Sequence, residues 1–441
     1  MVGTPVEAAG PASGNFQPPL LQSLQPSAHR PAIHTAIRGN HLMSIANPPI
    51  SDDSLKTVSY GLMPGGGDDE IDVQSEEMLV NMGPQHPSTH GVLRIVLRTD
   101  GEMVLEAVPH LGYLHRCKEK IGENLAYYQY IGYTDRLDYL AAMNNNHAWS
   151  MAVEKLADVE VPIRAEYIRV LASELNRIAS HLVSFGAYGL DMGAFTPFLY
   201  AFREREYILD LFEQLCGARL TLSYINVGGV TWDLPPLFLE KLTEFLDYFE
   251  PKIDEYNDLL SFNHIFIKRT SNIGVASKEM CIRYALSGPM IRGSGLPLDL
   301  RRDRPYSIYD RLEFDVCVGS GMKGTLGDCW DRYWVKMQEM KQCIRILRQC
   351  IAQMPDGPYR AKLPRNMKVP PGEVYAEYEN PRGHLGFYIE SQGGVIPYRV
   401  KIRGPSFVNL AVTSELCRNV LLADVPAIVG SIDIVMGEVD R

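Results

Sequence analysis

Nine consecutive residues at 83–91, GPQHPSTHG, bring two imidazole rings together with residues that restrict or redirect the backbone. The prolines fix φ and the glycines permit a left-handed turn, so we expect a rigid loop that holds His86 and His90 in place. Histidine is the side chain that changes charge most readily near neutral pH. The loop is therefore suited to proton transfer, to hydrogen bonding or to metal binding.

The spacing of the histidines invites a zinc hypothesis, because His86 and His90 are four residues apart and His110 and His115 are five apart. Two ligands four residues apart need one face of a helix. Pro87 directly follows His86 and disfavours a continuous helix there. We therefore expect no metal site at these histidines.

The eight cysteines contain no CxxC pair, and the closest two, Cys343 and Cys350, are seven residues apart in a helical pattern. This spacing predicts buried thiols in a reducing compartment more readily than a disulfide framework or a cluster site. We expect the chain to hold no metal or iron–sulfur cluster by itself.

Composition excludes several classes of protein. The chain has 441 residues, 46% of them hydrophobic, and a formal net charge of −10. An acidic chain offers no basic field for nucleic acid. A membrane-spanning helix needs about 18 or more apolar residues, and the best candidate, 420–437, is interrupted by Asp424 and Asp433. We expect a large folded domain without a membrane span.

The first 77 residues differ in composition from the rest. Residues 1–50 hold eight prolines, three histidines and a single acidic residue, and residues 51–77 turn acidic. Low acidity is typical of an organellar transit peptide, but the prolines disfavour an amphipathic helix. We predict that 1–77 is an extended arm contacting partner subunits, since a free arm of this composition would be disordered.

The hydrophobic periodicity changes along residues 78–441, which we expect to form one domain. Alternation at 93–97, the Asp100-Gly101 turn and a second strand at 103–108 predict a β-hairpin within a β region at 78–110. Apolar steps of three and four predict helices in a bundle at 111–355. The predicted helices are 162–189, one beginning at Thr196-Pro197 and ending at Cys216-Gly217, 235–261 and 330–354.

Short strands are predicted again in a β and loop region at 356–441, at 372–378, 384–390 and 394–403. The sequence therefore predicts an α+β fold with a central bundle of long helices, an N-terminal β-hairpin and short C-terminal strands.

Several motifs in order resemble one protein family. They are GPQHPSTHGVLR at 83–94, HLGYLHRCKEK at 110–120, YTDRLDY at 133–139, RVLASELNRIASHL at 169–182, LDMGAFTPF at 190–198, FREREYILDLFE at 202–213 and the ending VMGEVDR. Together they resemble the 49 kDa subunit of respiratory complex I, which is related to the large subunit of nickel–iron hydrogenases. The resemblance covers the chain from about residue 78.

The resemblance implies an α+β domain like the hydrogenase large subunit and a role in the H⁺-translocating NADH:ubiquinone reductase. The chain would form one wall of the ubiquinone headgroup pocket, and a [4Fe-4S] cluster on the adjacent small iron–sulfur subunit would donate the electrons. Other peripheral-arm subunits and a membrane-arm subunit at the quinone channel would be partners. The expected location is the matrix side of the mitochondrial inner membrane.

The resemblance also assigns roles to residues. His90 and Tyr139 would be the headgroup ligands and proton donors, and Asp191 would orient and charge the imidazole of His90. We expect Tyr139 on a helix that also carries Arg136 and Asp138. A neutral Tyr hydroxyl is a donor at physiological pH.

Four further residues are predicted near the quinone or the partner cluster: His86, Thr89, Arg116 and Arg136. Arg116 matches a position that is dimethylated in mitochondrial relatives, although a plain ion pair is an equal alternative. The charged run 203–206 would either tune the partner cluster or form a solvated helix face.

One position departs from the family pattern. Relatives carry GARxH near the partner cluster, and this chain has Gly217-Ala218-Arg219-Leu220-Thr221. Threonine does not titrate, so coupling between cluster reduction and protonation at this position is in doubt.

Two alternative functions remain. A hydrogenase-derived scaffold would organise its neighbours without touching substrate, and the presence of His90 and Tyr139 argues against it. A true hydrogenase subunit would need two CxxC pairs for its metals, and the chain has neither.

Overall fold

The computed structural model describes residues 77–364 and 366–441. The predicted arm at 1–77 therefore lies outside the described residues, apart from Glu77, which begins the first strand.

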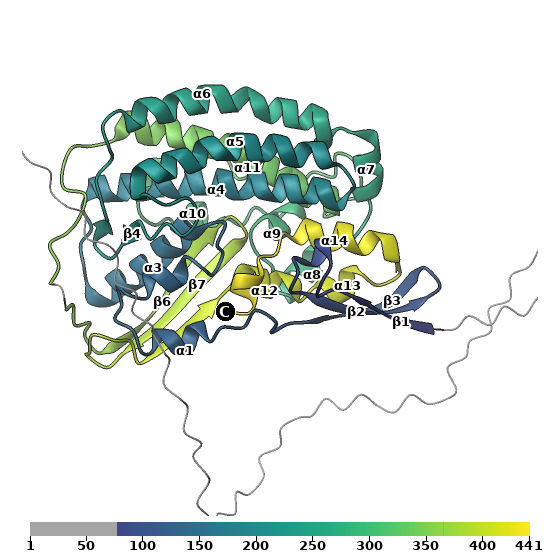
Figure 1. Cartoon of the computed structure of the whole chain (residues 1–441), viewed down its shortest axis with the longest axis horizontal. Helices are drawn as coiled ribbons and strands as arrows, with labels where there is room; N and C mark the ends of the chain where they lie inside the picture. The colour runs from purple at the N-terminus through teal and green to yellow at the C-terminus, as the bar shows by residue number, and fades with distance from the viewer. Residues whose placement is uncertain (1–76, 365) are drawn as a thin grey trace, which may run out of the picture. The chain divides into compact units, whose positions relative to one another are not determined.

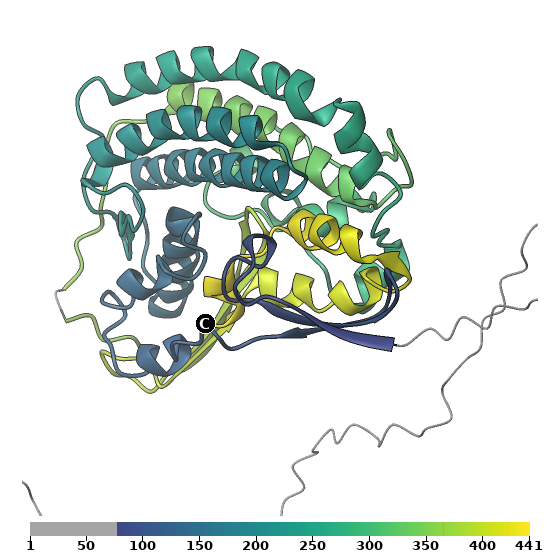
Figure 2. The same ribbon diagram turned by 45° about the vertical axis from the view of Figure 1, so that its right-hand side comes forward.

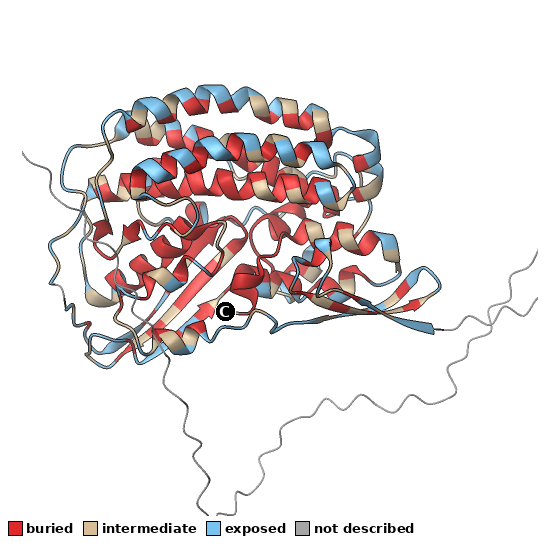
Figure 3. Ribbon diagram, viewed as in Figure 1, coloured by how far each residue is buried: buried red, intermediate tan, exposed pale blue. Residues whose placement is uncertain are grey.

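Long helices form one layer of the domain (Figures 1 and 2). They are α4 (Ile163–Asp191), α5 (Phe195–Cys216), α6 (Phe238–Tyr256) and α11 (Cys329–Gln353). Helix α4 packs against both α5 and α11, and α6 packs against the same two helices. Figure 3 shows α4 buried along most of its length and α6 exposed on its outer side. The apolar steps of three and four in 168–185 therefore face a core, as the sequence predicted.

The predicted start of α4 after Pro162 is confirmed, but its predicted end at Gly186 and Gly189 is wrong because the helix continues to Asp191. A Cβ atom on Gly186 would lie 3.1 Å from the Cα of Phe198, and one on Gly189 would lie 3.3 Å from the carbonyl oxygen of Ala194. The glycines allow α5 to approach α4 closely and do not terminate the helix.

The other helix predictions differ from the structure only at their ends. Thr196 was expected to cap the next helix but lies inside its first turn, because α5 begins at Phe195. The predicted helix at 235–261 is α6 followed by a π-helical turn at Asn257–Ser261. The predicted helix at 330–354 is confirmed as α11.

Helix α3 (Ala142–Ala157) was not predicted, because its first half is polar. Its residues 144–147 are three asparagines and a histidine, and all four are buried. Asn145 donates to the carbonyl oxygen of Asp138, and Asn146 donates to the Asp135 carboxylate. These hydrogen bonds offset the cost of burying Asn145 and Asn146, so the helix lies inside the domain despite its composition.

The N-terminal sheet has strands in the order β1-β2-β3-β9, all antiparallel. The strands are β1 (Glu77–Met82), β2 (Arg94–Asp100), β3 (Met103–His110) and β9 (Val420–Leu421). The predicted hairpin is β2 and β3. Strands β1 and β9 add an edge on each side, and the pairing of β9 ties the C-terminal region to this sheet.

The C-terminal sheet contains the predicted three strands, in the order β6-β7-β8. They are β6 (Gly372–Asn380), β7 (Gly383–Ser391) and β8 (Arg399–Arg403). Residues 394–398, predicted as part of the last strand, lie outside β8. Helix α3 packs on β6 and β7, which gives this sheet its own apolar core. The α+β fold class is confirmed.

Short elements complete the described chain. The helices are α1 (Lys118–Gly122), α2 (Ile131–Thr134), α7 (His264–Thr270), α8 (Lys278–Arg283), α9 (Pro289–Gly293), α10 (Leu300–Asp303), α12 (Pro405–Leu410), α13 (Thr413–Leu416), α14 (Val425–Ile432) and α15 (Met436–Val439). A two-stranded ribbon pairs β4 (Ile225–Asn226) with β5 (Gly229–Val230). Helix α14 packs against α4 and against the turn at 87–89, so it joins the histidine loop to the bundle.

Within the described residues, no helix is both long and apolar enough to cross a membrane.

Candidate functional site

The histidine loop is held by hydrogen bonds within itself. His86 caps a 3₁₀ turn at Pro87–Thr89, and its Nδ1 accepts from the backbone N–H of Ser88 at 3.2 Å. The buried Thr89 hydroxyl lies 3.0 Å from the His86 carbonyl oxygen and 3.2 Å from that of Pro84, either of which it can donate to. The loop is therefore fixed by internal contacts, as its prolines and glycines led us to expect.

His90 follows the 3₁₀ turn in a left-handed conformation, with φ of 54°. Part of the residue is exposed at the surface of the chain, although many protein atoms surround its imidazole. Desolvation by neighbouring protein atoms lowers the pKa of its imidazole, while the negative charge of Asp433 opposes this and the positive charge of Arg382 adds to it. His90 therefore favours the neutral form at neutral pH.

Tyr139 lies in the turn between α2 and α3, so the prediction that a helix carries it was wrong. The ring packs against Gly437, where a Cβ atom would lie 3.2 Å from Tyr139 Cδ1. Desolvation raises the pKa of the hydroxyl, and Arg382 partly offsets this. The hydroxyl is therefore protonated and able to donate at neutral pH.

Arg382 is a buried cation that sequence reasoning missed, and its charge acts on both His90 and Tyr139. It lies at the tight turn between β6 and β7. Its Nη1 donates to Asp138 at 2.8 Å, and its Nη2 donates to Asp433 at 3.2 Å. Burial opposes its charge, but these two carboxylates outweigh burial and raise the pKa of Arg382.

This cation brings together segments that are distant in sequence. Asp138 immediately precedes Tyr139, and Asp433 caps the C-terminal end of α14, the helix that packs on the histidine loop. A sequence pattern could not locate Arg382, because nothing in a turn containing Asn-Pro-Arg-Gly indicates which carboxylates it will meet. The sequence shows only that Arg382 lies between a proline and a glycine, two residues that favour turns.

Asp191, the last residue of α4, lies against the histidine loop on its other side. The Ser88 side chain and the imidazole of His86 both favour the charged carboxylate and so act to lower its pKa. Burial nevertheless raises the pKa of Asp191 to about 6. No hydrogen bond between Asp191 and His90 occurs among the described residues, so the expected direct pairing is replaced by contacts with the preceding turn.

Gly430 makes this position of Asp191 possible. A Cβ atom on Gly430 would lie 2.9 Å from Asp191 Oδ2 and 2.7 Å from a ring carbon of Tyr188. The absence of a side chain on α14 therefore lets the α4 carboxylate reach the loop.

The predicted basic residues Arg116 and Arg136 lie together at the surface. Arg116 Nη2 donates to the carbonyl oxygen of Arg136 at 3.0 Å. Lys118 lies beneath them, donating to the same carbonyl and to that of Gly437. Burial, with a smaller contribution from the charge of Arg116, lowers the pKa of Lys118 to about 7. Lys118 was not predicted as a site residue.

Glu438 is a second buried group with a pKa near neutral. Burial and the charge of Asp138 raise the pKa of its carboxyl to about 8. Its Oε1 accepts the backbone N–H of Ser406 at 2.9 Å. At neutral pH this carboxyl is mostly protonated, and it lies beside the Asp138–Arg382 pair.

The charged run at 203–206 does not form a simple solvated face. Glu204 is buried and accepts from Tyr256 at 2.7 Å and from Tyr248 at 3.0 Å, while Arg203 pairs with it from the surface. The run therefore connects α5 with α6. The action of this charged run on a partner cluster stays a prediction.

The GAR segment lies at the end of α5. Arg219 pairs with Asp210 at 2.7 Å, with Glu213 at 3.3 Å and also with Glu206. Thr221, two residues further on, is half-buried.

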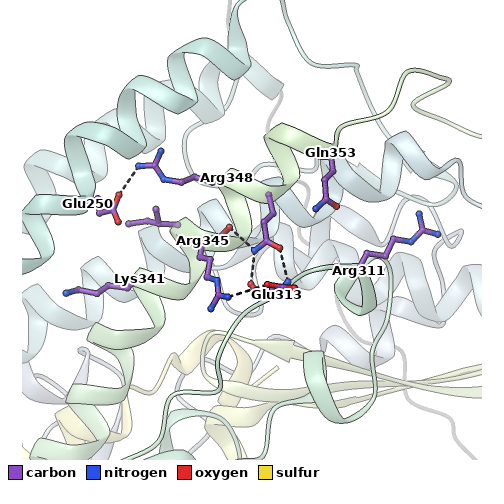
Figure 4. Close-up of a pocket in the computed structure, with 9 residues that line it drawn as sticks. Glu250, Arg311, Glu313, Lys341, Arg345, Arg348 and Gln353 are labelled. Carbon is purple, nitrogen blue, oxygen red and sulfur yellow. Dashed lines mark hydrogen bonds and ion pairs between the residues drawn. The ribbon is translucent and has the colours of Figure 1, made fainter.

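A surface groove of about 700 Å³ lies between α6 and α11 (Figure 4) and contains none of these residues. Its arginines and lysine are mostly engaged with acids: Arg348 with Glu250 at 2.8 Å and Lys341 with Asp254 at 2.8 Å. It is a charged surface, and neither a histidine nor a tyrosine lines it.

Among the described residues, no three histidine, cysteine or acidic side chains gather in a way that could hold a metal ion. All eight cysteines belong to the described part of the chain, and all are free thiols. His90 and Tyr139 instead share an electrostatic environment that Arg382 sets. It combines two neutral donors, one buried cation and carboxyl groups that titrate near neutral pH.

Comparison with known proteins identifies the family of this chain. The family described as "Respiratory-chain NADH dehydrogenase, 49 Kd subunit" matches residues 191–367 and 361–441. The chain is 53% identical over 376 residues to a subunit of the NADH-quinone oxidoreductase of Chlorobium chlorochromatii, covering 84% of this chain and 94% of that protein.

Two further relatives are the same subunit of NADH-quinone oxidoreductases from other bacteria. The protein from Desulforamulus reducens is 54% identical over 368 residues, covering 83% of this chain and 99% of the relative. The protein from Bacillus mycoides is 52% identical over 369 residues, covering 83% of this chain and all of the relative, at 100%. The chain therefore belongs to the family of 49 kDa subunits of the respiratory-chain NADH dehydrogenase, complex I, and the resemblance inferred from its motifs is confirmed.

Proposed function

We propose that this subunit forms one wall of the quinone headgroup site of complex I, with His90 and Tyr139 donating to the two quinone oxygens. The observation that supports this best is the buried Arg382, whose charge acts on both side chains. Quinone reduction takes up two electrons and two protons. A fixed cation and neutral donors near the oxygens favour that step, because they stabilise the negative charge as it develops.

In this proposal, Asp191 acts on His90 through the intervening 3₁₀ turn. Its electrostatic interactions with Ser88 and His86 would hold the turn that ends at His90. The hydroxyl of Thr89 fixes the same turn from inside the loop. Asp191 is thus a positioning residue.

Electrons would come from a [4Fe-4S] cluster on the small iron–sulfur subunit, because this chain lacks the cysteine spacing for a cluster of its own. The exposed pair Arg116 and Arg136 is the surface we assign to that contact. We expect other peripheral-arm subunits and a membrane-arm subunit at the quinone channel to complete the site. The names of the relatives, which contain the word quinone, support the substrate class.

The subunit would lie in the peripheral arm of the membrane-bound complex. The relatives named above come from bacteria, so they lend no support to the mitochondrial inner membrane, which was our expectation from the sequence. We therefore restrict the proposed location to the side of the membrane on which the peripheral arm stands.

The test is Tyr139→Phe in the assembled complex, which removes one donor and keeps the ring. Loss of a preorganised donor to developing charge costs about 2.7 to 4 kcal/mol, so we expect quinone reduction to fall about 100- to 1000-fold. The exposed Tyr128 provides a matched control, and Tyr128→Phe should leave the rate unchanged.

Turnover of short-chain quinones should be measured in preparations shown to contain all subunits. A near-normal rate in Tyr139→Phe would contradict the proposed role and favour a scaffold that does not touch the substrate. The rate of NADH oxidation by an artificial acceptor should stay unchanged in both variants, because such an acceptor takes electrons before they reach the quinone site.

A further inference from the structure

Lys336 is a buried lysine of α11, and its amine lies between α4 and the end of α14. Its Nζ donates to the hydroxyl of Ser184 on α4 at 2.9 Å and lies 3.3 Å from Oδ2 of Asp433. Burial lowers the pKa of this amine and the nearby cations Arg382 and Arg332 act in the same direction, while Asp433 opposes them. A buried charge in such surroundings depends on its carboxylate partner, so Lys336 and Asp433 should act as a unit.

Asp433 is held at each of its three oxygen atoms. Nη2 of Arg382 donates to Oδ1 at 3.2 Å, and Nε of Arg382 donates to the backbone carbonyl oxygen at 3.0 Å. Lys336 pairs with the remaining oxygen, Oδ2. Asp433 directly follows α14 and has a left-handed backbone, with φ of 58°. One cation from the β6–β7 turn and one from α11 therefore fix a residue whose backbone conformation is uncommon outside glycine.

Helix α11 also holds the end of α14 at a second point. Arg332 lies one turn before Lys336 on the same face of the helix, because residues four apart are neighbours there. Its Nη2 and Nε donate to the hydroxyl of Ser431 at 2.8 Å and 3.0 Å. Positive charges beside the C-terminal end of a helix are favoured by its dipole. The two cations of α11 therefore fix the position at which α14 ends.

Helix α14 connects these contacts to the histidine loop. It packs against the turn at 87–89, and a Cβ atom on its Gly430 would lie 2.9 Å from Asp191 Oδ2. The charge of Asp433 acts on His90 from the end of the same helix. A displacement of α14 would therefore change both the packing of the loop and the charge that acts on His90.

We propose that Lys336 is a positioning residue of the quinone site, which fixes Asp433 and the end of α14 and thereby determines the surroundings of His90. The proposal rests on the function proposed above, because it requires His90 to donate to the quinone. Lys336 does not touch the substrate in this arrangement. It acts on the donor that stabilises the developing charge, so its loss should lower kcat and leave KM nearly unchanged.

The test compares Lys336→Met with Lys336→Arg in the assembled complex, with a short-chain quinone as substrate. Methionine keeps the length of the side chain and removes its charge, whereas arginine keeps the charge. We expect kcat to fall about 10- to 100-fold in Lys336→Met, because a displacement of about 1 Å at a reacting group costs about 100-fold. Lys336→Arg should recover most of the rate, and Lys341→Met, a change at a surface lysine of the same helix paired with Asp254, should have no effect. An unchanged kcat in Lys336→Met, or a loss confined to KM, would overturn the proposal.

A double-mutant cycle with His90→Ala tests the path of the effect. His90→Ala removes one donor and keeps Tyr139, so a residual rate can be compared. If Lys336 acts through His90, adding Lys336→Met to this chain should lower kcat no further. A role in packing alone would lower kcat by the same factor with and without His90, and that result would overturn the proposal.

His90→Ala alone separates this proposal from the proposed function. A normal rate in that variant would contradict the role of His90 at the quinone. A reduced rate in His90→Ala together with a normal rate in Lys336→Met would contradict only the role of Lys336.

A second variant keeps the proposal testable if Lys336→Met fails to assemble. Lys336→Met with Asp433→Asn removes both charges of the pair, and Arg382 keeps Asp138 as its partner at 2.8 Å. We expect this chain to restore assembly but not kcat, because the charge that acts on His90 is lost. Restored assembly with a normal kcat, or no assembly of either variant, would show that the pair serves folding alone and would overturn the proposal.

Discussion

The guanidinium of Arg382 lies 2.8 Å from the carboxylate of Asp138, the residue directly before Tyr139. The same cation lies 3.2 Å from Asp433, whose charge opposes the lowering of the His90 pKa by burial. One buried arginine therefore links the two residues that we propose as quinone ligands. Because all three charges are buried, their removal one at a time should have large effects.

The first prediction concerns this cation. Arg382→Met should prevent assembly, because two buried carboxylates would lose their partner at a cost of about 3 to 5 kcal/mol. Arg382→Lys keeps the charge and loses the forked geometry, so it should assemble and reduce quinone about tenfold more slowly. Subunit content and turnover of the purified complex check both results.

A rescue variant keeps this prediction testable if Arg382→Met fails to assemble. Asp138→Asn in the same chain removes one of the unpaired charges and should restore part of the assembly. Arg304, an exposed arginine paired with Glu377, is the control, and Arg304→Met should change neither assembly nor turnover. No rescue by Asp138→Asn would mean that Arg382 is needed for packing alone.

The second prediction concerns Asp191, whose carboxyl is raised by burial to a pKa of about 6. As the pH falls through 6, Asp191 gains a proton and loses its charge, so its electrostatic interactions with His86 and Ser88 weaken. Quinone reduction should therefore fall on the acid side of this pH. Asp191→Asn should be slower at pH 7 and should lack this acid limb.

A double-mutant cycle tests the path of this effect. If Asp191 acts through the turn, then Asp191→Asn and Ser88→Ala together should be no worse than the poorer single variant. Turnover measured between about pH 5.5 and 8 in the four forms would decide, since this range brackets the pKa of Asp191. Additive losses would show that the two residues act separately.

The third prediction concerns stability at Lys118, whose pKa is lowered by burial to about 7 from 10.5. The unfolded chain binds this proton up to about pH 10.4, the reference value for lysine, while the folded chain loses it near pH 7. Stability from this group should therefore rise with pH between these values and be lowest at pH 7 and below. At 1.36 kcal/mol per pKa unit, the full shift lowers the free energy of unfolding by at most about 5 kcal/mol.

The measurement compares the apparent melting temperature of the complex with that of Lys118→Met from about pH 6 to 9, a range that begins below the folded-state pKa of the amine. The variant, in which methionine fills the space of the lysine, should melt at the higher temperature at low pH. This difference in melting temperature should diminish as the pH rises. Lys120, exposed and only two residues away, is the control position. A difference independent of pH would contradict a buried titrating amine.

The sequence predicted those parts of the fold that depend on local periodicity. The hairpin of β2 and β3 follows from strict alternation around an Asp-Gly turn, and α4 and α11 follow from apolar steps of three and four. Helix α3 was not predicted because its buried Asn145 and Asn146 form tertiary hydrogen bonds, which the local sequence does not indicate. Strand β9 was not predicted because it is only two residues long.

The candidate site divides in the same way. The rigidity of the histidine loop was predictable from its prolines and glycines, and the structure places Ser88 and Thr89 in the contacts that hold it. The electrostatic environment was not predictable. Arg382 and Asp433 approach His90 from a β-turn and from a helix end, and burial sets the pKa of Asp191. Such effects depend on which distant segments meet.

The last prediction concerns Thr221, which stands where the resemblance implies a histidine and where we expect the partner cluster. A histidine there gains a proton when the cluster gains an electron, because the added negative charge raises its pKa. Threonine provides no such proton. The midpoint potential of the cluster should therefore depend only weakly on pH between about 6 and 8, the range around the reference histidine pKa.

His181 is the residue that could replace the missing titrating group, and its environment argues against this. It is buried, its Nε2 lies 2.9 Å from Glu339, and desolvation lowers its pKa despite that carboxylate. Burial therefore makes its neutral form more favoured than that of a free histidine. We expect Thr221→His to introduce a slope where the native chain has nearly none, measured by redox titration of the cluster in the intact complex. A native slope approaching one proton per electron would show that another group titrates and that Thr221 is not the deciding position.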